Sequence, residues 1–177
     1  RNPLITSYGL HTSALFGFAN QVLKLIKSEN PDYIACAFDS KEKTFRHDMY
    51  KEYKANRSPM PDEMQLQLPH LWEMLEAMNL PVLKKPGVEA DDIIGVLVKK
   101  HHDQKILILS GHKDFIQLHN KNVQQYSPVL NKFIGKDETP SIYIKEHILK
   151  GDRSDGIPNV LSDDNVFVEG RRQRPLT

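Results

Sequence analysis

The run KILILSGHKD, residues 105–114, indicates the class of fold to which this chain belongs. Its first half is continuously apolar, as expected for a strand buried on both faces of a sheet. Its second half is polar and carries His112 and Asp114. An earlier apolar run, YIACAF at residues 33–38, ends in a similar way at Asp39. Two buried strands followed by polar groups favour a parallel sheet with functional side chains at the carboxyl ends of its strands.

Helical and strand patterns alternate along the chain. Apolar residues recur at helical spacing in five segments: 12–29, 62–78, 89–100, 115–118 and 142–149. Two further strand patterns lie at 80–83 and 123–126. This alternation predicts an α/β fold, with a parallel-stranded sheet flanked by helices on both faces.

The composition is that of a soluble globular protein. The chain has 177 residues, of which 39% are hydrophobic and 27% charged, and this suits one domain with a sizeable core. It contains no apolar run near the ~20 residues that cross a bilayer. Cys36 is the single cysteine, which excludes an intrachain disulfide and a cysteine-based zinc site. One cysteine also fits a reducing, cytoplasmic setting.

Charge is balanced overall but unevenly distributed. The net charge of +1 excludes a simple polycation but not a nucleic-acid-binding protein, because the distribution of charge matters more than its sum. Basic residues gather in segment 41–57, and carboxylates gather at 89–92 and 152–155. The sequence therefore offers a basic surface for a polyanion and a separate acidic cluster.

The acidic residues suggest a metal centre. The candidates are Asp39, Glu89, Asp91, Asp92, Asp114, Asp152 and Asp155. Carboxylates that meet at strand ends repel one another unless a cation lies between them. Magnesium prefers such hard oxygen ligands, and two ions ~3.5–4 Å apart can hydrolyse a phosphodiester. Taken alone, each carboxylate is more simply read as a solvated surface residue, a helix cap or part of a turn.

Four motifs resemble the 5′ nuclease family. That family includes the 5′-3′ exonuclease domain of bacterial DNA polymerase I, flap endonucleases and the RNase H of T-even phages. The motifs are GVEADDIIG at 87–95, TFR at 44–46 with YKANR at 53–57, PMP at 59–61, and GDRSDGIP at 151–158. Up to residue 100 the chain is most similar to the polymerase I branch, and from residue 105 onward it resembles the phage RNase H branch.

The resemblance implies two Mg²⁺ ions, with Mn²⁺ as an alternative. Asp39, Glu89, Asp91, Asp92 and Asp114 would bind or orient the first ion, and Asp152 and Asp155 would serve the second. His112 stands at a position where the family usually has a metal-binding aspartate. Imidazole is a poor magnesium ligand, whereas manganese tolerates it better.

The resemblance also assigns the basic segment. Segment 44–61 would form a helical arch over the substrate. Arg46, Lys54 and Arg57 would contact the scissile phosphate and stabilise negative charge in the transition state. Phe45 and Tyr53 would contact the nucleic acid, with Tyr53 stacked on a base near the 5′ end. For any one of these cations alone, a solvated helix face is the simpler reading.

Two further departures from the family pattern concern the ends of the domain. The family begins with a strand that ends in a metal-binding aspartate, and this chain is expected to start after it. After Pro158 the family has a glycine-rich DNA-gripping motif, but this chain reads NVLSDD. We expect residues 1–158 to form the nuclease core without its first strand. Residues 159–177 would begin a truncated DNA-binding region or a tail.

The predicted function is a 5′-3′ exonuclease or flap endonuclease of DNA replication and repair. It would act on 5′ flaps, RNA primers or RNA–DNA hybrids as a monomer without a membrane partner. A DNA polymerase fused to it, or working with it, would be its partner, or else a single-strand binding protein. Two alternatives remain open: a catalytically impaired binder of branched DNA, and a PIN-type ribonuclease with a similar acidic core.

Overall fold

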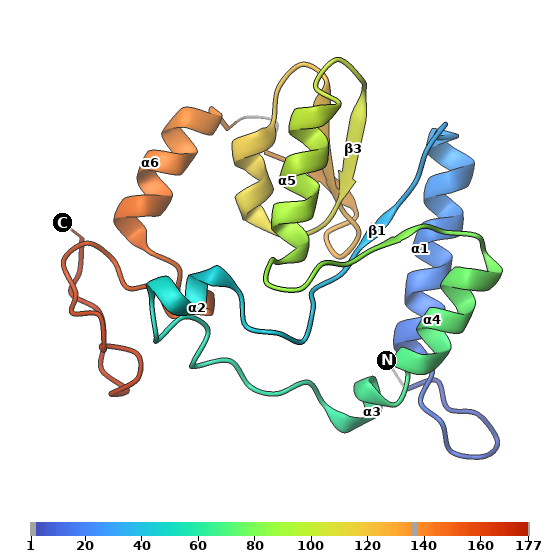
Figure 1. Cartoon of the computed structure of the whole chain (residues 1–177), viewed down its shortest axis with the longest axis horizontal. Helices are drawn as coiled ribbons and strands as arrows, with labels where there is room; N and C mark the ends of the chain where they lie inside the picture. Colours follow the sequence, from blue (N-terminus) through green and yellow to red (C-terminus); the bar gives the residue numbers. More distant parts are fainter. Residues whose placement is uncertain (1–2, 136–137, 177) are drawn as a thin grey trace. The chain divides into compact units, whose positions relative to one another are not determined.

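A computed structural model describes residues 3–135 and 138–176 (Figure 1). The chain divides into two compact units. The first comprises the residues up to Phe38 and Ser58–Leu83, and the second comprises Asp39–Arg57 and the residues from Lys84 onward. Every residue that the sequence assigned to a functional site lies in the second unit. Within the described ranges, the helices are too short or too polar to cross a membrane.

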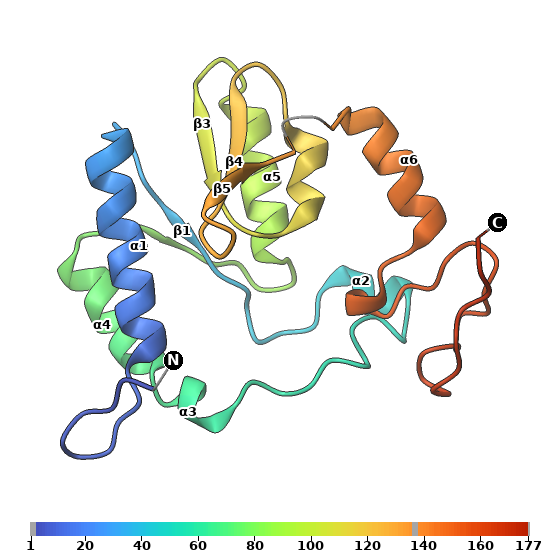
Figure 2. The same cartoon turned by 180° about the vertical axis from the view of Figure 1, so that it is seen from behind.

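The first unit packs two helices with a small parallel sheet. α1 (Ser13–Glu29) and α4 (Leu68–Ala77) lie side by side in both views (Figures 1 and 2). β1 (Cys36–Ala37) pairs in parallel with β2 (Val82–Leu83). The apolar stripes of both helices meet in one core, whose buried members are Val22, Leu75 and Leu80. Burial of such a stripe stabilises a helix more than its intrinsic propensity does.

The predicted continuous helix over 62–78 is wrong at one point. The structure has α3 (Asp62–Gln65), a turn, and then α4, which begins at Leu68. Pro69 has no N–H to donate, so a helix can restart at this proline more easily than it can run through it. The turn buries Gln67, whose side-chain oxygen accepts hydrogen bonds from the N–H groups of Ala14 and Leu15. Gln67 thus satisfies two N–H groups in the first turn of α1.

The second unit is built on a three-stranded sheet. β3 (Ile106–Leu109) pairs in parallel with β4 (Val123–Ser127), and β4 pairs antiparallel with β5 (Lys132–Ile134). α5 (Ala90–Lys100) and the 3-10 helix η1 (Lys113–Leu118) lie on one face of this sheet in both views (Figures 1 and 2). Their shared core contains Val98, Ile108, Phe115 and Val123. The predicted α/β class, with its parallel strand pairs, is confirmed.

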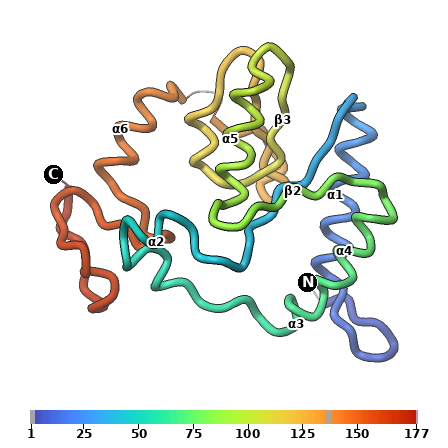
Figure 3. Tube along the Cα trace, viewed as in Figure 1, coloured from blue at the N-terminus to red at the C-terminus, as the bar shows by residue number. Residues whose placement is uncertain are grey.

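Three short elements complete the second unit: α2 (Phe45–Met49), α6 (Pro140–Lys150) and the 3-10 helix η2 (Arg153–Asp155). After α2 the chain forms turns rather than a longer helix, and Lys54 adopts a left-handed conformation with φ 57°. The segment 45–57 runs beside η2 (Figure 3), where the Lys54 N–H donates to the Asp155 carbonyl at 2.8 Å. Tyr53, Lys54 and Arg57 therefore do not share the face of a helix.

Candidate active site

The N-terminus of α5 gathers three of the predicted carboxylates. The Asp92 side chain accepts from the Glu89 N–H at 2.9 Å, and the Glu89 side chain accepts from the Asp92 N–H, so the two form a reciprocal cap. Asp39 reaches the same helix end, where its carboxylate accepts from the Ala90 N–H at 2.7 Å. The partial positive charge of a helix N-terminus favours these anions.

Asp91 lies beside this cap, and its carboxylate faces the imidazole of His112. Burial raises the pKa of the Asp91 carboxyl, and the neighbouring charges of Asp39 and Glu89 raise it further. His112 opposes this shift, with its Nε2 3.7 Å from the Asp91 carboxylate. The charged form of Asp91 is thus disfavoured first by burial and then by the nearby carboxylates.

Three cations from segment 45–57 pair with the other carboxylates. Arg46 donates two hydrogen bonds of 2.8 Å to the two oxygens of Asp92. The Lys54 ammonium lies 2.6 Å from Glu89, and the Arg57 guanidinium pairs with Asp155. The hydrogen bonds and charge of Asp92 raise the pKa of Arg46 above its ordinary value, although burial opposes the shift. One short stretch of chain therefore supplies the positive charge for three carboxylates.

Tyr53 is buried beneath these ion pairs. Its hydroxyl donates toward Glu89 at 2.9 Å and toward Asp155 at 3.1 Å. Burial first, and then the hydrogen bond to Glu89, raise the pKa of Tyr53 far above its ordinary value, so the hydroxyl keeps its proton. Because the ring is 5% exposed, it is enclosed by protein in this conformation. Stacking of Tyr53 on a base stays a prediction that requires movement of this segment.

Phe45 lies at the edge of the same segment. Its side chain is exposed, and the Arg46 guanidinium lies 4.6 Å from the centre of its ring. That stacking orients the arginine toward the acidic cluster. The nucleic-acid contact assigned to Phe45 stays a prediction.

η1 brings His112 and Asp114 to the site. His112 caps this helix, because its Nδ1 accepts from the Asp114 N–H at 3.3 Å. The chain leaves β3 at Leu109 and reaches His112 three residues later, where the imidazole lies beside Asp91 at the start of α5, as expected for the carboxyl end of a parallel strand.

Asp152 is fixed by the turn that joins α6 to η2. Its carboxylate accepts from the Ser154 N–H at 2.7 Å and from the Ser154 hydroxyl at 2.6 Å. Burial opposes ionisation, but these hydrogen bonds hold the pKa of Asp152 below its ordinary value. Gly151 makes the turn possible with φ 68° and ψ −174°, a conformation that is open essentially to glycine alone.

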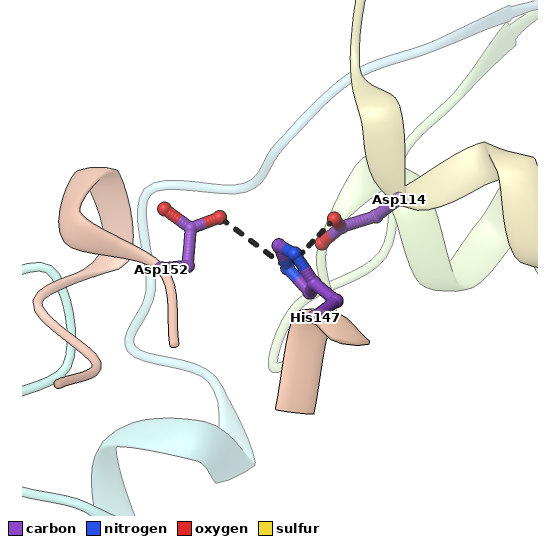
Figure 4. A group of neighbouring side chains, drawn as sticks. All are labelled: Asp114, His147 and Asp152. Atoms are coloured by element: carbon purple, nitrogen blue, oxygen red, sulfur yellow. Dashed lines mark ion pairs between the residues drawn. The ribbon is translucent and has the colours of Figure 1, made fainter. Parts of the chain in front are cut away.

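His147 is a site residue that sequence analysis missed. Its Nε2 lies 3.2 Å from Asp114 and 3.7 Å from Asp152, so the imidazole stands between two predicted metal ligands (Figure 4). The sequence held one signal for it: His147 lies in the last turn of α6, a few residues before Gly151 and Asp152.

The predicted residues thus converge in one unit of the chain. A cavity of about 860 Å³ is lined by Arg46, Tyr53, Glu89, Asp91, Asp92, Asp114 and Asp155, among others. Asp39, His112 and Asp152 connect to this set through the contacts described above. The cavity thus has both carboxylates and a cation in its lining. Such an arrangement suits a phosphate and its counterions.

Residues 1–149 match the family described as 5′-3′ exonuclease, N-terminal resolvase-like domain. The chain belongs to this 5′-3′ exonuclease family. It is 41% identical to a DNA polymerase I of Caldicellulosiruptor bescii, over 89% of this chain and 20% of that protein. It is 35% identical to a 5′-3′ exonuclease of Aquifex aeolicus, over 89% of this chain and 58% of that protein. The chain thus spans less than two thirds of the length of these relatives.

The fold is also that of a solved 5′ nuclease. A flap endonuclease of bacteriophage T5, in a complex with DNA and metal ions, superposes with a TM-score of 0.67 and 20% identity. The match covers 87% of this chain and 66% of the phage protein. At this identity the likeness establishes the shared fold, and the family match independently supports the resemblance found in the motifs.

Proposed function

We propose that this chain is the core of a metal-dependent 5′ nuclease that hydrolyses phosphodiester bonds at 5′ flaps or RNA primers. One observation carries the proposal. Carboxylates from four separate segments meet in one unit, at Asp39, at the start of α5, in η1 and beside η2. Structural carboxylates are usually scattered on the surface, so their convergence beside an open cavity indicates a functional site.

The donor set fits divalent cations. Asp39, Asp91, Asp114 and Asp152 offer hard oxygen ligands, and a bound cation would offset the burial and the like charges that raise the pKa of Asp91. These four residues would hold the ions, with Glu89, Asp92 and Asp155 orienting them. When bound, divalent ions would lower the pKa of a water nucleophile and neutralise charge on the phosphate.

The cations of segment 45–57 would bind the phosphate. A guanidinium can exchange a bidentate carboxylate for a phosphate with the same geometry, so Arg46 is suited to hold the scissile group. Lys54 would add a point charge, and Arg57 would bind a neighbouring phosphate. Tyr53 would keep Glu89 and Asp155 in place from below. These contacts read the backbone and not the bases, which suits recognition of structure over sequence.

We further propose a role in DNA replication and repair. The Caldicellulosiruptor relative is a DNA polymerase I of which this chain matches one fifth. A polymerase that displaces a strand produces the 5′ flap that such a nuclease removes, so a polymerase on the same chain or in the same complex is the expected partner. The preferred substrate would be a 5′ flap or an RNA–DNA hybrid.

A catalytically impaired DNA binder is the second candidate. His112 favours it, because an imidazole stands where the family usually has a carboxylate, and its Nε2 lies 3.7 Å from Asp91. In that case His112, and not a metal ion, would be the partner of the Asp91 carboxylate. Such a protein would bind branched DNA through Arg46, Lys54 and Arg57 without cutting it.

The two candidates are separated by an experiment that measures both cleavage and binding by the protein. The substrates are 5′-flap DNA and an RNA–DNA hybrid, each with Mg²⁺ or Mn²⁺. A nuclease cuts near the 5′ end and loses about 100-fold or more in rate on Asp91→Asn, since even the loss of a group that only supports a metal ligand costs about 10- to 100-fold. Asp32→Asn, an exposed carboxylate of the other unit, serves as control. Binding without metal-dependent cleavage would instead establish the impaired binder.

A further inference from the structure

Asp114, His147 and Asp152 form a ligand set of mixed chemistry. One potential ligand atom from each of the three side chains lies within 4.8 Å of the other two. Figure 4 shows the imidazole between the two carboxylates, with Nε2 3.2 Å from Asp114 and 3.7 Å from Asp152. Donors about 2.1 Å from one ion lie about 3 Å apart at a right angle and about 3.4 Å apart in a tetrahedron. The observed separations are close to those of donors that share an ion.

The three side chains are held by different rigid elements. Asp114 lies in η1, His147 in the last turn of α6, and Asp152 caps η2. Tyr143, one turn earlier on α6, stacks on the His147 ring with centroids 5.5 Å apart and an interplanar angle of 13°. This stacking fixes the plane of the imidazole so that Nε2 faces both carboxylates. A site whose ligands are preoriented in this way loses little entropy on binding an ion.

Tyr143 supplies a second, independent indication of a ligand. Its hydroxyl is buried and, within the described part of the chain, has no hydrogen-bond partner. Burial, followed by the charge of Asp114, raises the pKa of this hydroxyl to about 12. A buried donor without a partner costs free energy, and native proteins rarely leave one unsatisfied. A water bound to an ion near Asp114 could donate to the oxygen of this hydroxyl, and an anion bound with the ion could accept from its hydrogen.

We propose that Asp114, His147 and Asp152 bind a first-row transition ion, Mn²⁺, Co²⁺ or Zn²⁺, in preference to Mg²⁺. An imidazole nitrogen suits these ions, whereas Mg²⁺ demands oxygen ligands in near-ideal octahedral geometry. The inference rests on the proposed function, because Asp114 and Asp152 are carboxylates assigned there to metal binding. It adds His147 as a ligand and thereby selects the metal.

The competing explanation is that His147 is a protonated counterion. A cationic imidazole would pair with both aspartates and would oppose any divalent ion. The two explanations predict opposite effects of removing the imidazole. If the imidazole is a ligand, its removal weakens binding of Co²⁺. If it is a cation, its removal strengthens binding of every divalent ion alike.

The test measures metal binding to the chain at neutral pH. Co²⁺ binding is followed by its d–d absorption, and Mn²⁺, Zn²⁺ and Mg²⁺ are measured by competition. His147→Ala is expected to weaken Co²⁺ and Zn²⁺ binding about 10- to 100-fold, as loss of a group that tunes a metal site does, and to leave Mg²⁺ within about twofold. His102→Ala removes an exposed histidine at the end of α5 and is expected to change nothing.

A second variant guards against loss of folding. His147→Gln keeps a side chain of similar size, and its far-ultraviolet circular dichroism is compared with that of the unchanged chain. It should show the same loss of Co²⁺ binding and of the d–d absorption that reports it. Co²⁺ affinity unchanged in a folded His147 variant, or tighter binding of all four ions, would overturn the proposal.

This readout is separate from cleavage. If His147 selects Co²⁺ and Zn²⁺ but the protein cuts no DNA substrate, the proposed function fails and the metal site stands. If the protein cuts flap DNA while His147→Ala binds every ion as before, the metal site fails and the proposed function stands.

Discussion

At the scale of single residues, Tyr53 joins parts of the site that lie far apart in the chain. Its buried hydroxyl donates to Glu89 and Asp155, which follow in different motifs. Both acceptors are buried carboxylates, and they share the single hydrogen of this hydroxyl. Tyr53 is therefore better placed to position carboxylates than to meet a base in this conformation.

We expect Tyr53→Phe to lower the free energy of unfolding by about 1.5–3 kcal/mol, because hydrogen bonds to charged groups are worth that much. Urea denaturation of the metal-free chain measures the effect. Tyr126→Phe is the matched control, since its hydroxyl donates to Asn131 at an exposed position. Tyr126→Phe should lower the free energy of unfolding by less than about 0.5 kcal/mol. Equal costs for the two variants would show that Tyr53 does not hold the carboxylates.

His112→Asp is expected to raise Mg²⁺ affinity about tenfold, because it adds a hard oxygen ligand beside Asp91 and Asp114. Aspartate can still cap η1 as His112 does, so folding should be unaffected. His112→Asn keeps a cap without the charge and should leave Mg²⁺ affinity near its original value. Calorimetric titration with Mg²⁺ distinguishes the variants. No difference between the Asp and Asn variants would place His112 outside the metal centre.

The sequence could predict which carboxylates matter, but not how each is neutralised. The motif around Glu89 and Asp92 is contiguous, so its residues were found together. The pairing of Arg57 with Asp155, and the position of His147 beside Asp114, depend on how distant segments pack. Long side chains have many rotamers, and local spacing carries no record of the partner that a tertiary contact selects.

At the scale of elements, the turn between α6 and η2 sets the position of Asp152. A Cβ on Gly151 would lie 2.4 Å from the Pro158 backbone, which no side-chain rotation can relieve. The conformation with φ 68° is also unfavourable for any other residue. The glycine is thus required by both space and backbone geometry.

Gly151→Ala should lower the free energy of unfolding by about 3 kcal/mol or more, since strain and a backbone clash add. Gly170→Ala is the control, because Gly170 also has positive φ, at 66°, but has nothing within 4 Å of a built Cβ. That variant should cost about 1–2 kcal/mol, the strain of a left-handed residue alone. Thermal or urea denaturation measures the free energy of unfolding of the two variants. A cost for Gly151→Ala no larger than for Gly170→Ala would contradict the packing argument.

Elements with strong periodicity were predicted well, and short ones were not. The predicted helices at 12–29 and 89–100 match α1 and α5 closely, because their apolar stripes span several turns. β5 was missed, since three residues hold too little pattern to separate a strand from a loop. The predicted strand at 33–38 is reduced to β1, Cys36–Ala37, where it pairs with a partner of only two residues.

At the scale of the whole molecule, metal binding should stabilise the chain. The proposed ligands lie on segments that are separate in sequence, so an ion bound to the folded state links them and is absent from the unfolded state. At a free metal concentration 100 times the dissociation constant, one site adds about 2.7 kcal/mol. Melting with Mn²⁺, and again after EDTA, measures the gain and its loss.

Asp91→Asn and Leu75→Ala separate this effect from general stability. Asp91→Asn should raise metal-free stability, since burial disfavours the charged form of this carboxyl, and should reduce the metal-induced gain. Leu75→Ala opens the core of the other unit and should lower the free energy of unfolding by about 2–5 kcal/mol while preserving the metal-induced gain. A metal-induced gain that Asp91→Asn leaves unchanged would remove this residue from the metal centre.

The ion pairs between segment 45–57 and the carboxylates have one more consequence. A nucleic-acid phosphate that draws Arg46 away from Asp92 leaves that carboxylate without its counter-charge, and a divalent ion restores the balance. Each ligand therefore improves the affinity for the other, and thermodynamic reciprocity makes the two gains equal. The affinity for nucleic acid should consequently be lower when it is measured without divalent ions. The affinity for divalent ions should likewise be lower when it is measured without nucleic acid.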